Sequence, residues 1–178
     1  MKRSRGQSLV EFALLSPILL LLAAGMLDLG RAYYYEVASI DAARDAARYG
    51  IGLSRNPADQ PGPGYQAICD YATTDLSNVT LFGSNLSSVE CRTAASLPAT
   101  TRPYYPAGTY SVAPNQALVV IYCPDGPAAC VGDRNSTANA NLSVTVYYGF
   151  SVLTPGMNGF IGSDALTFEN TAVMKSLW

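Results

Sequence analysis

The chain has 178 residues, the length of about one domain. Apolar residues make up 49% of it and charged residues 13%, about half the charged share of an ordinary soluble protein, which indicates a membrane or secreted protein. The absence of histidine excludes Ser-His-Asp and Cys-His catalysis and any His-ligated metal or haem. A net charge of −2, with no basic stripe, argues against nucleic-acid binding.

An apolar segment follows a short basic leader. Lys2, Arg3 and Arg5 precede residues 9–27, which are almost all Leu, Ala, Ile, Phe and Val. About 20 helical residues cover ~30 Å, the thickness of the hydrocarbon core of a bilayer. Because a basic flank marks the cytoplasmic side, the pattern predicts one membrane span with the remaining ~150 residues outside the cytoplasm.

The helix is expected to continue beyond the membrane. Residues 31–49 contain no Gly or Pro, and many are good helix formers. Charged residues fall on one face of this helix. The side chains on the opposite face are mostly small, so another element can approach it closely. Gly50 and Gly52 then provide a C-terminal stop. The small face consists of Ile40, Ala43, Ala46 and Ala47.

Two residues inside the apolar segment need an explanation. Glu11 costs ~2.5–3.5 kcal/mol at the centre of a membrane helix and less near an end. It could form a capping box with Ser8, or reach the cytoplasmic interface. Pro17 removes a backbone hydrogen bond and predicts a kink or a locally melted turn, the alternative being a proline that the membrane helix tolerates.

The first fifty residues carry several motifs in a specific order. They are Gly6 with Glu11-Phe12 five residues later, Pro17, Asp28-x-Gly30-Arg31, and Ala42-Ala43-Arg44-x-Ala46-Ala47-Arg48. In this order and at these offsets the sequence resembles class III (prepilin-type) signals, and more narrowly the TadE-like pseudopilins of tight-adherence (Flp/Tad) pilus systems. The resemblance runs from about Arg5 to Gly50.

The resemblance implies a role in assembly. In the family a membrane-embedded aspartyl prepilin peptidase cuts after the glycine, so the expected scissile bond is Gly6–Gln7. The new α-amine of Gln7 would then meet Glu11 of a neighbouring subunit, since a paired carboxylate is tolerated in a low-dielectric bundle and fixes the register. The implied partners are the peptidase, other pilins or pseudopilins of the filament, an inner-membrane assembly platform and membrane lipid.

The exported portion is expected to contain a sheet. Residues 65–76 could form a short helix, and the apolar run 117–122 predicts a strand covered on both faces. Residues 142–150 alternate with period two, as in a half-buried strand, and residues 166–175 do so less regularly. We expect a small antiparallel sheet lying against the alanine face of the helix.

Four cysteines lie in the exported portion, where an even count implies disulfides with three possible connectivities. The favoured pairs are Cys69–Cys91 and Cys123–Cys130, because the second pair brackets a Pro-Asp-Gly-Pro turn. A zinc site is the alternative, but the closely spaced cysteine pairs of such sites are missing. We therefore expect no metal, no cofactor and no catalytic residue.

Together these features predict an α+β protein: a long N-terminal transmembrane helix that extends into the exported side and packs against a small antiparallel sheet with disulfides. The expected divisions are a leader (1–6), the helix (7–50), a linker (51–64) and an exported module (65–178). The resemblance implies a location in the bacterial inner membrane, with a single pass and the C-terminal module outside the cytoplasm, and in the extracellular pilus after assembly. Alternatives are an ordinary secretory signal cleaved before Met26, a signal-anchored adhesin or binding module, and an extracytoplasmic hydrolase.

Overall fold

The computed structural model confirms the α+β architecture and describes residues 6–52, 64–79, 88–93, 110, 112–122, 141–154 and 166–175. The elements in chain order are two helices, α1 (Gln7–Gly52) and α2 (Gly64–Ser77), and four strands, β1 (Ser88–Thr93), β2 (Gln116–Tyr122), β3 (Asn141–Phe150) and β4 (Leu166–Lys175).

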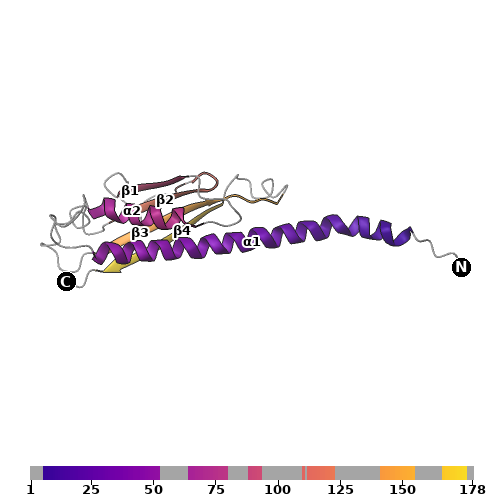
Figure 1. Ribbon diagram of the computed structural model, residues 1–178, viewed down its shortest axis with the longest axis horizontal. Coiled ribbons are helices and arrows are strands. Elements are labelled where there is room, and N and C mark those ends of the chain that lie inside the picture. The colour runs from indigo at the N-terminus through magenta and orange to yellow at the C-terminus, as the bar shows by residue number, and fades with distance from the viewer. Residues whose placement is uncertain are drawn as a thin grey trace.

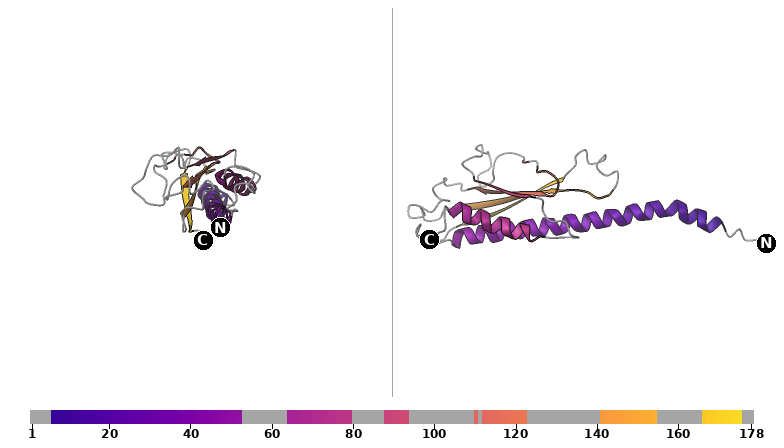
Figure 2. Two further views of the ribbon diagram at one scale, coloured as in Figure 1. Left: turned by 90° about the vertical axis from the view of Figure 1, so that its left-hand side faces the viewer. Right: turned by 45° about the horizontal axis from the view of Figure 1, so that its top comes forward.

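Helix α1 dominates the shape of the molecule (Figure 1). It has 46 residues, which corresponds to a length of about 69 Å. Its C-terminal half lies along the sheet, whereas its indigo N-terminal half extends away from the other elements. Both helices cover the same face of the sheet, with α1 against β3 and β4 and α2 against β1 and β2 (Figure 2).

The sheet has the order β1-β2-β3-β4 and is mixed. β2, β3 and β4 form the expected antiparallel sheet, whereas β1 adds a fourth strand parallel to β2, which the expectation of an antiparallel sheet did not include. A parallel pair requires a crossover connection of about a dozen residues or more, and the 22 residues from 94 to 115 are long enough for one. The sequence between residues 77 and 115 led us to expect loops and a strand, but it carried too little periodicity to place that strand or to predict its direction.

The main core lies between the sheet and the alanine face of α1, which confirms that expectation. Ala42, Ala43, Ala46 and Ala47 are buried together with inward-facing residues of β2 and β3. The backbones approach so closely that a Cβ atom at Gly50 would overlap the side chains of Leu142 and Ile68. Gly50 therefore lies inside α1, which ends at Gly52, and makes room for β3 and α2.

A second, smaller core covers the other face of β3. Val112, Leu118, Val120 and Tyr147 are buried there, with Tyr110 packed against them. The expectation of a half-buried β3 was therefore wrong, because all of its residues after Asn141 are buried. Alternation of residue type correctly indicated a strand, but the more polar side found partners within the protein, such as the hydrogen bond of 2.8 Å between Thr145 and Thr171.

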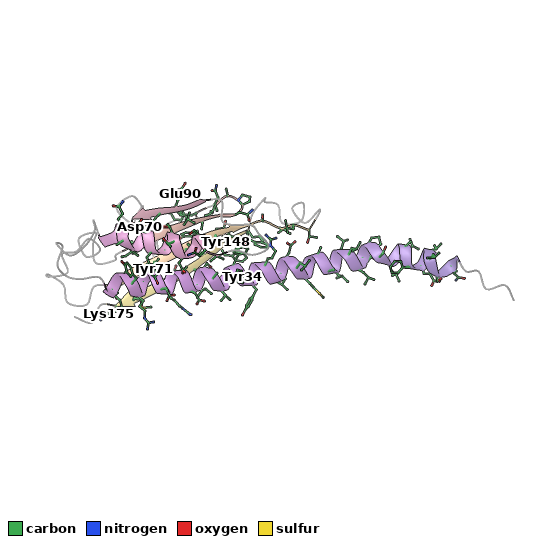
Figure 3. All side chains as sticks on the ribbon, in the orientation of Figure 1. Tyr34, Asp70, Tyr71, Glu90, Tyr148 and Lys175 are labelled. Atoms are coloured by element: carbon green, nitrogen blue, oxygen red, sulfur yellow. A yellow bond between two sulfur atoms is a disulfide. The ribbon has the colours of Figure 1, made fainter. Side chains whose placement is uncertain are left out.

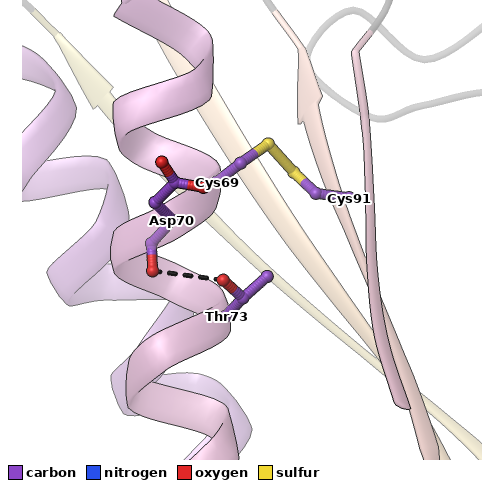
Figure 4. The surroundings of a disulfide bond; sticks show 4 residues. All are labelled: Cys69, Asp70, Thr73 and Cys91. Carbon is purple, nitrogen blue, oxygen red and sulfur yellow. Dashed lines mark hydrogen bonds between the residues drawn. A yellow bond between two sulfur atoms is a disulfide. The ribbon is translucent and has the colours of Figure 1, made fainter. Parts of the chain in front are cut away.

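One predicted disulfide is present. Cys69 of α2 and Cys91 of β1 are bonded, with their Cα atoms 5.8 Å apart (Figure 4). The expected short helix corresponds to α2, and a hydrogen bond of 3.1 Å from the Thr73 hydroxyl to the Asp70 carbonyl lies within it. The expected Cys123–Cys130 bridge lies outside the described residues.

Candidate functional site

Helix α1 begins at Gln7, the residue that follows the expected cleavage position. Gly6 forms a turn, and its carbonyl accepts a hydrogen bond of 3.2 Å from the Val10 amide. The capping-box explanation of Glu11 required Ser8 to stand before the helix as its N-cap. Ser8 is instead already helical, so the structure does not support that explanation.

Glu11 lies on the surface of α1, one turn after Gln7. Within a single copy its carboxylate accepts a hydrogen bond of 3.3 Å from the Gln7 side-chain amide. The two residues that the resemblance singled out therefore share one face of the helix, as their i,i+4 spacing requires. Both are exposed in the isolated chain.

The backbone remains helical through Pro17, so the described residues show no melted turn there. Proline has no amide hydrogen to donate to the carbonyl four residues earlier, which here belongs to Ala13. The Ser16 hydroxyl donates to that carbonyl at 3.3 Å. This bond supplies the missing donor, a means by which membrane helices tolerate proline. Figure 1 shows α1 bending in its indigo part, although a kink at Pro17 itself stays a prediction.

The first half of α1 is apolar and uncovered. Within the described residues it is the one helix long and apolar enough to cross a membrane, and none of its most apolar stretch is buried. A core helix of a soluble protein would bury such side chains, so this surface indicates a membrane anchor or signal. Its exposed large side chains include Leu9, Phe12, Leu14, Ile18, Leu20 and Leu22.

A buried charge pair marks the point where α1 meets the sheet. The Asp28 carboxylate accepts hydrogen bonds from the Leu153 amide at 3.1 Å, the Thr154 amide at 2.8 Å and the Thr154 hydroxyl at 2.5 Å. Arg31, one turn further along, donates to the same carboxylate at 3.2 Å. These bonds join α1 to the segment after β3, at a sequence separation of 125–126 residues.

More contacts follow along the same stripe of α1. The Arg31 guanidinium lies 5.3 Å from the centre of the Phe150 ring, and the Tyr35 ring stacks on Tyr148 at 4.8 Å. Asn170 of β4 donates a hydrogen bond of 2.6 Å to the Ser39 hydroxyl. The docking stripe consists of Asp28, Arg31, Tyr35, Ser39, Ala42, Ala43, Ala46, Ala47 and Gly50, all of which are buried.

From the sequence alone, Asp28 and Arg31 are only part of a motif that carries the family resemblance, and no contact is assigned to them. The signal was present, because both belong to the Asp-x-Gly-Arg motif at i,i+3 spacing. Their partners lie in Leu153 and Thr154, which no local pattern connects with the helix. The alanine face could be recognised in the sequence because its residues recur with helical spacing. A contact between distant segments leaves no such pattern.

A shallow pocket of about 410 Å³ lies where the end of α1 meets α2. Tyr49 and Tyr71 stack there with ring centres 4.6 Å apart, and Asp70 and Asp75 also line it. Burial, with the nearby carboxylates of Asp45 and Asp41, raises the pKa of Asp75. No group of three potential metal-ligating side chains occurs in the part of the chain that the structure describes.

The fold and these contacts define an α+β module carried on one membrane-length helix whose free half is available for association. Residues 6–48 match the family model described as TadE-like protein, so the N-terminal region, about a quarter of the chain, is that of a TadE-like pilin-family protein. The match implies a structural rather than catalytic protein in the context of Tad pilus assembly. No curated protein and no solved structure matched the chain.

Proposed function

We propose that the chain is a minor pilin or pseudopilin of a Tad-type pilus, processed at the Gly6–Gln7 bond and packed into the filament through α1. The observation that carries the proposal is the uncovered apolar half of α1, with one carboxylate, Glu11, a single turn from its first residue. The match to the TadE-like family, which begins at Gly6, supports it.

The physical argument concerns the carboxylate of Glu11. Cleavage would place a new ammonium group on Gln7, the first residue of the helix. When helices pack side by side, an unpaired carboxylate in a low-dielectric environment is costly, whereas one that meets a neighbour's ammonium is tolerated. Glu11 therefore disfavours the isolated subunit and selects one axial register between neighbours.

The proposal divides the chain into a leader (1–6), a transmembrane and extended helix (7–50), a linker (51–64) and an exported module (65–178). Before assembly the subunit lies in the bacterial inner membrane with the module outside the cytoplasm. Its partners are a prepilin peptidase, the other pilins or pseudopilins of the filament, and the inner-membrane assembly platform. The module stays attached through the docking stripe of α1.

The test compares Glu11→Ala with Asp41→Ala, a matched removal of an exposed carboxylate from the same helix. In cells that assemble the pilus, Glu11→Ala is expected to insert into the membrane normally but to be lost from the sheared pilus fraction. Asp41→Ala should be incorporated like the unmodified protein. Normal pili containing Glu11→Ala would contradict the proposal and favour a signal-anchored adhesin or binding module.

The N-terminal residue of the membrane-extracted protein provides an independent test. Processing by a prepilin peptidase leaves Gln7 as the first residue. An ordinary signal peptidase acting after Ala23-Ala24-Gly25 would leave Met26, and an uncleaved anchor would keep Met1. Either of the last two results would remove the ammonium group on which the pairing of Glu11 depends.

A further inference from the structure

The charged residues that end the apolar segment in the sequence are hidden in the fold. Asp28 is only 7% exposed and Arg31 only 4%, whereas their neighbours Leu29 and Tyr33 are 71% and 72% exposed. The carboxylate is covered by Leu153 and Thr154, and the guanidinium lies over Phe150. The module therefore removes both charges from the outer surface of α1.

As a result, the uncharged surface of α1 is longer than the sequence suggests. Asp28 and Arg31 are the only charged residues between Phe12 and Tyr35. With both buried, 24 residues present no exposed charge, a length of about 36 Å against ~30 Å for a hydrocarbon core. The extra length ends at tyrosines, which favour the boundary between lipid and water.

The exported module adds an apolar side chain of its own beside this part of α1. Leu153 is 69% exposed, although its backbone amide is bonded to the buried Asp28. The described residues at the nearby end of β2, β3 and β4 are also uncharged, since residues 113–116, 149–154 and 166–167 contain no Asp, Glu, Lys or Arg. Figure 3 shows Lys175 at the opposite end of the sheet, further from the free half of α1 than Tyr148 is.

We propose that the module docks directly on the outer leaflet of the bilayer through a collar made of Met26, Leu29, Tyr33, Tyr34 and Leu153. The occupant is lipid, because the collar continues the apolar surface of α1 without an intervening charge. The boundary of the membrane then lies near Tyr33 and Tyr34 and not at Leu27. This inference rests on the membrane anchoring that is part of the proposed function.

The test uses tryptophan fluorescence of the full chain in phosphatidylcholine bilayers with brominated acyl chains, which quench indole on contact. Trp178→Phe removes the single native tryptophan. Leu153→Trp and Tyr33→Trp then report on the collar separately. If one of these variants fails to fold, the other still gives a result. Val173→Trp, 43% exposed and paired with Ser143 at the far end of the sheet, is the control, and Leu19→Trp reports on anchoring itself.

Leu19→Trp is expected to be quenched strongly, and the two collar reporters to be quenched clearly but less than Leu19→Trp, because side chains at the headgroup–acyl boundary lie close to the acyl chains. Val173→Trp should be unaffected. If both collar reporters behave like Val173→Trp while Leu19→Trp is quenched, the inference is wrong but the anchoring stands. If Leu19→Trp is not quenched either, the anchoring and the inference both fail.

Discussion

Asp28 shows how one carboxylate can join segments that are far apart in the chain. It accepts bonds from two backbone amides and a hydroxyl while it balances the charge of Arg31. Such a group is tolerated in a buried position because each of its partners is supplied by the fold. Its removal would leave the guanidinium of Arg31 buried without its counter-charge.

We therefore expect Asp28→Ala to destabilise the protein by about 3–5 kcal/mol, the usual cost of removing one member of a buried ion pair. The matched variant Asp45→Ala removes an exposed carboxylate from the same helix and should change stability by no more than about 0.5 kcal/mol. Thermal unfolding of the full chain in detergent, followed by circular dichroism, measures both. Equal midpoints for the two variants would contradict this role of Asp28.

Gly50 should respond to substitution in the opposite way from an ordinary helical glycine. Replacing glycine by alanine inside a helix commonly stabilises it by about 0.5–1 kcal/mol. A Cβ atom at Gly50 would overlap buried Leu142 and Ile68, whereas one at Gly30 meets nothing within 4 Å. We expect Gly50→Ala to cost about 1–3 kcal/mol, and Gly30→Ala to be neutral or stabilising in the same unfolding measurement. A stabilising Gly50→Ala would show that α1 and β3 pack less closely than the structure describes.

Asp75 gives a pH-dependent prediction. Its pKa is raised by burial and by Asp45 and Asp41, so the folded state holds its proton more tightly than the unfolded state does. Its contribution to stability therefore improves as the pH falls through that raised pKa, and its charge is unfavourable at neutral pH. Asp75→Asn should raise the unfolding midpoint slightly at pH 7, within the ~0.5 kcal/mol typical of surface changes. The difference from the unmodified chain should vanish in acid; a difference that persists there would point to another cause.

At the scale of elements, periodic patterns and continuous apolar runs predicted well, whereas segments with neither did not. The alanine face of the helix and the strands at 142–150 and 166–175 follow from repeated spacing, the strand at 117–122 follows from a continuous apolar run, and the structure contains all of them. The parallel partner β1 has only six residues and followed a segment without a clear pattern. The two-sided burial of β3 depends on Val112 and Leu118, which belong to other segments.

The candidate site divides in the same way. Gln7, Glu11 and Pro17 are close in sequence, so their common helix could be predicted, although their proposed roles remain to be tested. The bonds of Asp28 to Leu153 and Thr154 could not be predicted, because they depend on the way the whole chain folds back on α1.

The disulfide between α2 and β1 is the element-scale feature most open to experiment. It closes a loop with a sequence separation of 22 residues, for which chain-entropy arguments give about 3 kcal/mol. We expect the double variant Cys69→Ser, Cys91→Ser to lose about this much in denaturant unfolding, with the membrane fraction unchanged. Unaltered stability would show that the disulfide does not stabilise the fold and that other contacts hold α2 against the sheet. The variant Cys123→Ser, Cys130→Ser applies the same measurement to the second expected bridge.

At the scale of the whole molecule, the protein divides along α1 into a half that is covered by its own sheet and a half that is uncovered. The covered half begins at Asp28, and its buried stripe extends to Gly50. The uncovered half carries Gln7 and Glu11 and matches, with most of the covered half, the TadE-like family. Folding therefore uses the covered half of the helix, and the proposed association uses the uncovered half.

The docking stripe has a mechanical consequence. Its contacts recur at nearly every turn of α1 from Asp28 to Gly50, and the helix has no break from Gln7 to Gly52. The described contacts therefore leave no flexible joint between the uncovered half of α1 and the exported module. If the uncovered halves of α1 pack together in neighbouring copies, their packing also sets the rotational orientation of every exported module. Torque applied to the module is then transmitted along α1 to the packed helices.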